Sequence, residues 1–367
     1  MDDKKFNKYK TVADIIDKSF STFKELLKPG EKIYHLAKLN DQNILNELNK
    51  TYKNLKKGLS MPTCISVNET VCHYAPIEND DYKLKEGDLI RFEVAAHIDN
   101  CNVTLGDTLE ISTNNFDDIK YLQTAMSTGI KLVEPGFELN QFDKLIKKMT
   151  ESHGYYLLER PYVFKEPDVK LQYDWSRKDT EKFLEQSWIV KCDEEIDLED
   201  LEEIDEAQLK DNTEFNVNEV YHLEIAVSKD KTSCKVSDRQ PTLFQKGYRK
   251  YQLKTKMARE VLSEVNKNIG NCVFTLSDLN MQESKAKLGM RECTNQVVLR
   301  SLGLIVKKDP VFRIKCSIYI MKNNVYILSG KFNTLEIIDD IETDLEFLKV
   351  FNQDSKFNKR YINEKSL

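Results

Sequence analysis

A carboxylate in the middle of a predicted β-hairpin is the side chain best placed to do chemistry in this sequence. Glu93 lies in residues 88–97, where apolar and polar residues alternate, and Asp99-Asn100 supply a turn into a second segment, 102–110. This pattern predicts two antiparallel strands with an inward and an outward face. Carboxylate oxygens bind divalent cations, so the residue opposite Glu93 decides whether the hairpin holds a metal.

Other sequence motifs for catalysis are missing. The sequence contains no G-x-S-x-G, no P-loop and no G-x-G-x-x-G, which argues against an α/β-hydrolase, a P-loop NTPase and a dinucleotide-binding enzyme. The eight cysteines are scattered without a C-x-x-C pair, a distribution typical of buried, reduced thiols rather than of a zinc site or a disulfide framework. We therefore assign no catalytic nucleophile.

The composition predicts a soluble, intracellular protein. The chain has 367 residues, of which 40% are hydrophobic, enough to bury a large core. The N-terminus, MDDKKFNKYK, lacks the apolar region of a signal peptide. No apolar run approaches the ~20 residues that a membrane-spanning helix needs.

The net charge of −6 is the sum of two opposite patches. In residues 193–206, ten of fourteen side chains are acidic, whereas residues 229–267 contain eleven Lys or Arg against four Asp or Glu. Residues 248–265 have the pattern of a helix with a basic face, which is suited to contact phosphates; an ordinary solvated helix face is the alternative. The candidate RNA-binding residues are Lys246, Arg249, Lys250, Lys254, Lys256 and Arg259.

Two similar helical pairs precede strands along the chain. Apolar residues recur at helical spacing over 11–27 and 33–55, and again over 117–133 and 139–149, and in both pairs a Pro-Gly lies between the helices. The repetition predicts two similar halves around one sheet. Two unrelated helix ends that share a Pro-Gly stop are the alternative.

The later part of the chain is less regular. Residues 160–215 have no long period and are interpreted as an insertion. Residues 220–228 alternate like a core strand, and 311–328 predict a hairpin. Residues 277–302 predict two helical pieces broken near Gly289.

Several of these stretches together resemble one known family. They are KKGLSMPTCISVNETVCHYAPIENDDYKLKEGDLIRFEVAAHID, NEVYHLEIAVS, YQLKTKMAREVLSEV, FTLSDLNMQESKAKLGMRECTNQVVL and IMKNNVYILSG, within a similarity that covers about residues 8–335. They resemble type II methionine aminopeptidases and, more closely, their non-peptidase relatives, the proliferation-associated, ErbB-receptor-binding protein family. The resemblance implies an α+β pita-bread fold, in which two pseudo-symmetric halves surround a curved, largely antiparallel sheet.

The resemblance also implies how the chain is organised. We expect a single domain over residues 8–345, a first half 8–112, a second half 116–345, an insertion 160–215 that contains the acidic run 193–206, and a short C-terminal tail 346–367.

In the active peptidases of this fold, two Asp, one His and two Glu hold two metal ions, and the resemblance assigns a residue to each position. The two Asp correspond to Glu93 and Thr104, the His corresponds to Leu171 in the insertion, and the two Glu correspond to Glu224 and Lys315. Asp107 lies an odd number of residues beyond Thr104 and is expected on the opposite face of its strand. His73 corresponds to a histidine beside the substrate; a packed histidine at a strand end is the alternative.

This set of residues predicts a pocket without metal. Two carboxylates, a threonine and a lysine do not supply the ligand charge that offsets the repulsion between two divalent cations. We therefore predict no metal, no other cofactor and no catalytic residue, and a vestigial pocket of His73, Glu93, Thr104, Glu224 and Lys315. In this hypothesis the Lys315 ammonium fills the metal space and pairs with Glu93, Glu224 or both.

The function that the resemblance implies is binding to the large ribosomal subunit near the polypeptide tunnel exit, with ribosomal RNA and ribosomal proteins as partners. The chain is then a translation, maturation or ribosome-capping factor, expected as a monomer in the cytoplasm, or also in the nucleus and nucleolus. The acidic run is expected to turn away from RNA or to meet basic ribosomal proteins. The alternatives are a peptide- or histone-binding module that uses the vestigial pocket, and a surviving metallo-aminopeptidase.

Overall fold

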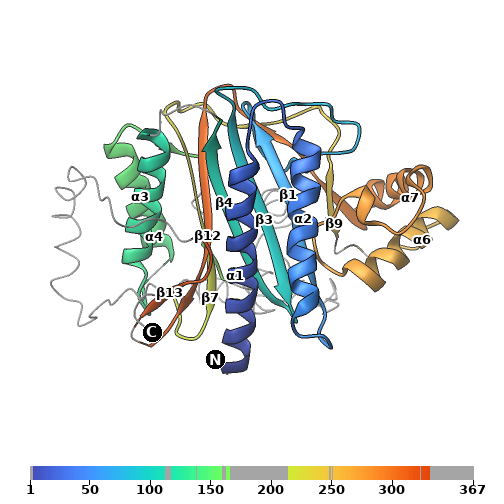
Figure 1. Ribbon diagram of the computed structural model, residues 1–367, viewed down its shortest axis with the longest axis horizontal. Helices are drawn as coiled ribbons and strands as arrows, with labels where there is room; N and C mark the ends of the chain where they lie inside the picture. The colour runs from blue at the N-terminus through green and yellow to red at the C-terminus, as the bar shows by residue number, and fades with distance from the viewer. Residues whose placement is uncertain are drawn as a thin grey trace.

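A central antiparallel sheet organises the fold (Figure 1). The computed structural model describes residues 3–111, 117–137, 139–158, 163–165, 214–247, 249, 251–322 and 324–330. In these residues the sheet has eight strands and a main path β1-β3-β4-β12-β7-β5, with β13 paired to β12 and β6 paired to β7. The strands are β1 Lys57–Val67, β3 Leu89–Ile98, β4 Cys101–Glu110, β5 Tyr156–Leu157, β6 Val163–Lys165, β7 Val220–Ser228, β12 Val311–Ile320 and β13 Val325–Ile327.

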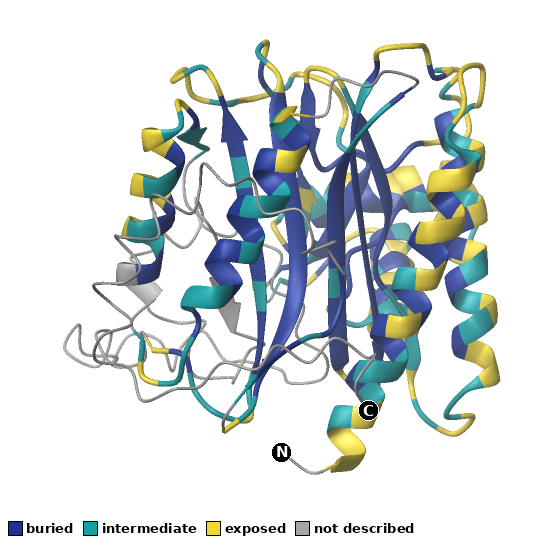
Figure 2. Ribbon diagram, turned by 60° about the vertical axis from the view of Figure 1, so that its left-hand side comes forward, coloured by how far each residue is buried: buried dark blue, intermediate teal, exposed yellow. Residues whose placement is uncertain are grey.

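Two pairs of helices cover one face of this sheet, as the repeated helical pattern predicted. They are α1 Asp3–Leu26, α2 Ile33–Lys50, α3 Asp117–Leu132 and α4 Leu139–Ser152. The first pair packs on β1, β3 and β4, and α3 packs on β7 and β12 with α4 against it. Figure 2 shows the consequence, since the sheet and the sides of α1, α2 and α3 that face it are buried, while their outer sides are exposed.

The predicted hairpin is β3 and β4, which pair from Leu89↔Glu110 to Ile98↔Cys101. Phe92 on β3 points toward the helices, where its ring centroid lies 4.8 Å from that of Phe20 and 4.5 Å from that of Phe23. Successive side chains of a strand alternate between faces, so Glu93 points away from the helices. The predicted strand 220–228 is β7, and the predicted hairpin 311–328 is β12 and β13.

Two small sheets lie against the face of the main sheet that carries Glu93. One contains β2 Thr70–Cys72, β8 Lys235–Val236 and β11 Ile305–Val306; the other contains β9 Leu243–Lys246 and β10 Leu299–Leu302. Ala95 of β3 packs in one buried cluster with Leu243 and Leu302. The residues around Glu93 are therefore inside the protein.

A helical lobe extends from β9 and β10 and is built on α6 Lys256–Glu264 and α7 Glu283–Asn295 (Figure 1). The prediction of one helix over 248–265 is wrong in its first part. Residues 251–254 form no regular secondary structure, and the helix begins only after Thr255, whose hydroxyl accepts a hydrogen bond from the backbone N–H of Ala258. That side-chain bond is a helix N-cap, and it fixes where the helix starts.

The predicted helix break at Gly289 is also wrong. α7 runs through this residue, and residues 299–302 form β10 instead of helix. A Cβ at Gly289 would lie 2.6 Å from the carbonyl oxygen of Met257 in α6. The glycine therefore serves close packing of α6 against α7, and does not end the helix.

Several predictions concern residues outside those that the structure describes. They include most of the insertion 160–215 with its acidic run, Leu171, and the tail 346–367. None of the described helices is long and apolar enough to cross a membrane.

Candidate functional site

Four neighbouring strands bring one residue each into a row across the inner face of the sheet. Glu93 of β3 is paired with Gly106 of β4, Gly106 with Lys315 of β12, and Lys315 with Glu224 of β7. Residues directly opposite each other on antiparallel strands point to the same face. The row therefore joins three positions of the predicted pocket, although they are up to 222 residues apart in the chain.

Gly106 lets the lysine cross the sheet. A Cβ at this position would lie 3.2 Å from the Cβ and 3.4 Å from the Cγ of Lys315, and 3.2 Å from the carbonyl oxygen of Phe92. Because the glycine has no side chain, the Lys315 stem lies over β4 and its ammonium reaches Glu93 on β3. A larger residue would compete with the lysine for that space.

A closed network of four charged side chains fills the row. The Lys315 ammonium pairs with Glu93 and lies 3.0 Å from Oε2 of Glu224. The prediction was that this lysine pairs with Glu93, Glu224 or both, and it pairs with both. Arg313, two residues earlier on β12, also donates to both. Its Nη1 lies 2.5 Å from Oε2 of Glu93, and its Nε donates to Oε1 of Glu224.

The network is buried and electrically balanced. None of its four side chains is more than 8% exposed. Burial by itself would raise the pKa of Glu93, but the charges and hydrogen bonds of Arg313 and Lys315 outweigh burial and lower that pKa to about 2. The two carboxylates raise the pKa of Arg313 against the opposing effect of burial. Glu93 and Arg313 each therefore stabilise the charged form of the other.

The remaining pocket residues stand apart from this network. Thr104 lies on the same face as Glu93, but its hydroxyl donates to the carbonyl oxygen of Val94. His73 has its Nδ1 2.9 Å from the carbonyl oxygen of Gly303, which can only accept, so this nitrogen carries the hydrogen. Burial lowers the pKa of His73 to about 4 and keeps the ring neutral. His73 is therefore a packed histidine in this structure, which was the alternative to a position beside the substrate.

Asp107 points to the opposite face, as its spacing predicted. It is paired with Phe92, whose ring packs under α1, and it is buried there. Burial raises the pKa of Asp107 to about 7. This carboxylate therefore cannot replace the missing partner of Glu93.

The residues present do not fit a two-metal centre. Glu93 and Glu224 supply carboxylates, but Arg313 and Lys315 already occupy oxygens of both. A dication in the same space would meet two positive charges. Among the described residues no group of three or more His, Cys, Asp or Glu is arranged to hold a metal ion, and Leu171 lies outside them.

The predicted RNA-binding residues do not share a helical face. Lys246 belongs to β9, Arg249 and Lys254 lie exposed in the connection to α6, and Lys256 is the first residue of that helix. Arg259 donates through Nη1 to the carbonyl oxygens of Leu253 and Lys254, at 2.9 and 2.8 Å, and so holds the connection in place. Lys250 is outside the described residues.

The fold and this row define a metallopeptidase-like protein. The chain belongs to metallopeptidase family M24, whose family model matches residues 7–233, and it has the pita-bread fold. ERBB-3 binding protein 1 of Solanum tuberosum is 30% identical over 336 residues, which cover 86% of this chain and 79% of that protein. Proliferation-associated protein A of Dictyostelium discoideum is 24% identical over 315 residues, with 82% and 75% covered. The predicted resemblance to the proliferation-associated, ErbB-receptor-binding family is confirmed.

A solved structure supports the same fold. A thermophilic Arx1 superposes with a TM-score of 0.73 and 22% sequence identity, covering 97% of this chain and 99% of that one. The match extends over the whole architecture, including the region beyond residue 233.

Arg313 is the member of the network that sequence reasoning missed. The signal was available, because residues two apart on a strand share a face and Arg313 precedes Lys315 by two. The family correspondence predicted pocket residues only at the positions of the peptidase metal ligands. No metal ligand of the peptidases corresponds to Arg313.

Proposed function

We propose that this chain is a peptidase-inactive member of family M24 that binds the large ribosomal subunit near the polypeptide tunnel exit. The observation that carries the first part is the closed network, in which Arg313 and Lys315 pair with Glu93 and Glu224. An aminopeptidase of this fold needs those carboxylates for its metal ions. Here their charge is already neutralised inside the protein.

The ribosomal part of the proposal rests on the family resemblance and on exposed cations. Arg249 and Lys254 are exposed beside α6 and belong to the segment with the local excess of positive charge. Phosphate contacts release counterions, so binding through such residues falls steeply with salt. The proposed location is the cytoplasm, and also the nucleus if the chain acts in subunit maturation.

The alternative of a peptide or histone in the vestigial pocket has less support. The four charged side chains of the row are at most 8% exposed, and Ala95 beside them is packed against Leu243 and Leu302. A ligand would have to displace a buried ion network to enter.

Cosedimentation with purified large ribosomal subunits tests the ribosomal part. We expect binding at 50 mM salt to weaken about tenfold in Arg249→Glu/Lys254→Glu, and the slope of affinity against salt to decrease by roughly 0.9 for each phosphate that the variant no longer neutralises. The matched control is Lys285→Glu/Lys287→Glu on the exposed side of α7. It makes the same change in charge and should stay within about threefold of the unchanged chain. Equal binding by all three proteins, or no binding at low salt, would contradict the proposal.

A further inference from the structure

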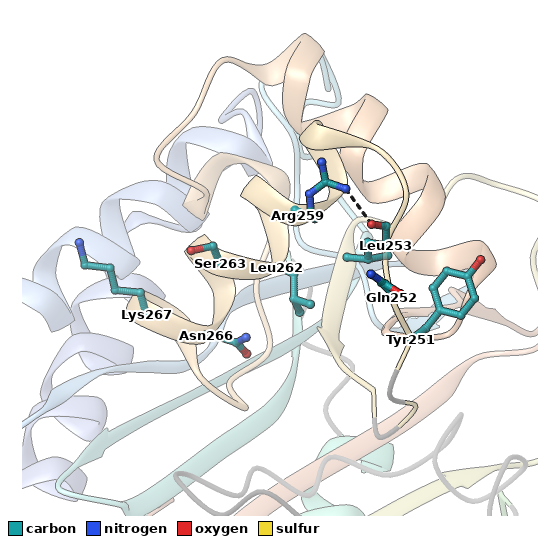
Figure 3. Close-up of a pocket in the computed structure, with 8 residues that line it drawn as sticks. All are labelled: Tyr251, Gln252, Leu253, Arg259, Leu262, Ser263, Asn266 and Lys267. Carbon is teal, nitrogen blue, oxygen red and sulfur yellow. Dashed lines mark hydrogen bonds between the residues drawn. The ribbon is translucent and has the colours of Figure 1, made fainter.

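An open groove of about 790 Å³ lies between α6 and the connecting segment that leads into it (Figure 3). One wall is the segment 251–253. The other wall is a single face of α6 and the turn that follows it, with the lining residues Arg259, Leu262, Ser263, Asn266 and Lys267. These positions recur at three- and four-residue spacing, so they form one stripe of the helix. Ala258 and Val261 are buried on the other side.

The groove contains polar groups that the protein itself leaves without partners. Within the described residues, no hydrogen bond reaches the backbone N–H or C=O groups of Tyr251 and Gln252, nor the side chains of Gln252, Ser263 and Asn266. Figure 3 shows Gln252 on one wall and Asn266 and Leu262 on the other. A segment whose backbone groups have no partner can pair with the backbone of a second, extended chain.

A π-helical turn shapes one end of the groove. Residues Val265–Ile269 form this turn, closed by a 2.7 Å hydrogen bond from the N–H of Gly270 to the carbonyl oxygen of Val265. Val265 is buried in the core of the lobe, while Asn266 and Lys267 line the groove. Single π turns are rare in helices and occur frequently at functional sites.

The groove is positively charged. None of the described residues that line it is acidic, and Arg259 and Lys267 both line it. Nη1 of Arg259 holds two carbonyl oxygens of the segment, and within the part of the chain that the structure describes Nε and Nη2 make no hydrogen bond. Arg249 and Lys254 are exposed next to it. The charge favours an anionic partner.

The lining favours a polypeptide over a nucleic acid. An unpaired base binds by stacking on an aromatic face, and the one aromatic ring among the described lining residues, Tyr251, is at the end of the groove with the guanidinium of Arg249 5.9 Å from its centroid. The apolar lining is aliphatic, and its accessible part is Leu262, because Leu253 is only 4% exposed. Aliphatic surface with amide groups on both sides matches a peptide backbone and an apolar side chain.

We propose that this groove binds an extended, acidic polypeptide segment of a partner protein. The segment pairs its backbone with Tyr251 and Gln252, places an apolar side chain on Leu262, and directs alternate acidic side chains to Arg259 and Lys267. Every second side chain of an extended chain points to the same side, so the acidic, apolar and acidic side chains that face this single stripe of α6 stand at positions i, i+2 and i+4 of the peptide. This site is separate from the buried ion network and does not depend on ribosome binding.

Fluorescence anisotropy with a fluorescein-labelled Asp-Ser-Leu-Ser-Asp peptide, whose first, third and fifth side chains share one side, and the full chain tests the proposal. We expect saturable binding with a Kd of about 10–100 µM. Leu262→Glu should weaken it at least tenfold, and Asn266→Ala about threefold. The matched control is Leu288→Glu on α7, where the leucine is 61% exposed and outside the groove. It should change the Kd less than twofold, and thermal unfolding verifies that each variant is folded.

Two further peptides separate the contributions of the apolar and the acidic side chains to binding. Asp-Ser-Ser-Ser-Asp, which lacks the apolar side chain, should bind at least tenfold more weakly, and Lys-Ser-Leu-Ser-Lys should not bind. The proposal is overturned if Leu262→Glu and Leu288→Glu bind the acidic peptide equally well. It is also overturned if the peptide fails to bind while a labelled uridine hexanucleotide binds in a manner that Leu262→Glu abolishes, because the groove is then an RNA site. Loss of ribosome cosedimentation in the Arg249/Lys254 variant leaves this outcome unaffected.

Discussion

The buried row and the groove of the helical lobe contain the same kinds of side chain in opposite states. In the row, Arg313 and Lys315 contact Glu93 and Glu224, and none of the four is more than 8% exposed. In the groove, Arg259 and Lys267 line an open surface on which no described residue is acidic. The cations of the row are satisfied by the protein, whereas those of the groove remain available to a partner.

This difference gives the two regions different roles: the buried row stabilises the structure, and the groove is suited to binding a partner. Desolvating a charge costs several kcal/mol, so a buried ion persists only when a partner compensates it. The row meets that condition internally and has no charge left for a metal or a substrate. The groove remains hydrated and incurs no such cost until something binds. In this member of metallopeptidase family M24, the groove offers charge to a partner and the buried row does not.

Replacing Lys315 by Met should produce the largest effect. The change leaves two buried carboxylates with one cation, and breaking a buried pair from one side costs about 3–5 kcal/mol of unfolding free energy. Urea denaturation measures this loss. The matched variant in the groove, Lys267→Met, removes the same charge from an open site and should change the unfolding free energy by less than about 0.5 kcal/mol.

Restoring the balance of charge sharpens the same comparison. Lys315→Met/Glu224→Gln again pairs one cation with one carboxylate, and it should recover part of the lost stability, with a coupling of about 1–3 kcal/mol between the two sites. Equal losses for Lys315→Met and Lys267→Met would show that burial does not distinguish the two regions. Additive losses in the double variant would show that the row is not a coupled network.

The other face of the same hairpin contains a buried carboxylate that belongs neither to the ion network nor to the groove. Asp107 forms no ion pair within the described residues, and burial raises its pKa to about 7. Its pKa in the unfolded chain is about 3.9, so the folded state binds more protons between these values, and stability falls as the pH rises from 4 to 7. Asp107→Asn removes the buried charge. It should stabilise the protein by about 1–3 kcal/mol at pH 8 and by about zero at pH 4.

Urea denaturation at the two pH values measures this difference. Glu93 is the reference within the molecule, because its cations lower its pKa to about 2 and its contribution to stability is lost only as the pH falls from about 4.3 toward 2. A gain for Asp107→Asn that is the same at both pH values would exclude titration of Asp107 as its cause.

Much of the sheet and its helices was predictable from the sequence because the signals are local. The alternation in 88–110 gave the hairpin, and helical spacing before and after each Pro-Gly gave the two pairs. The ion pairs of Lys315 were predictable because the family correspondence places this lysine where the active peptidases have a metal-binding Glu. What alternation alone does not supply is which strands become neighbours, since β4 and β12 are adjacent in the sheet but about 200 residues apart in sequence.

The lobe was predicted poorly because its signals are not local. Gly289 looks like a helix break in sequence, and only the contact with Met257 explains why a glycine lies inside α7. The basic spacing around residue 250 matches a helix, but residues 251–254 form no regular secondary structure and α6 begins only after Thr255. The groove was not predicted, because it depends on how the segment 251–253 faces α6.

Adding metal should have the smallest effect, and it tests whether the row is closed. We expect Mn²⁺, Co²⁺ or Zn²⁺ to shift the Tm of the unchanged chain by less than about 1 °C, because a ligand stabilises only the state that it binds. Stoichiometric metal in the purified protein would contradict this.

The sharper experiment restores two acids with Thr104→Asp/Lys315→Glu. While Arg313 is present, we expect this variant to remain unresponsive, because the guanidinium contacts both Glu93 and Glu224. Adding Arg313→Ala should allow a metal-dependent rise of about 2 °C or more. If the variant that retains Arg313 already responds, the lysine alone closes the site, and the arginine only supports it.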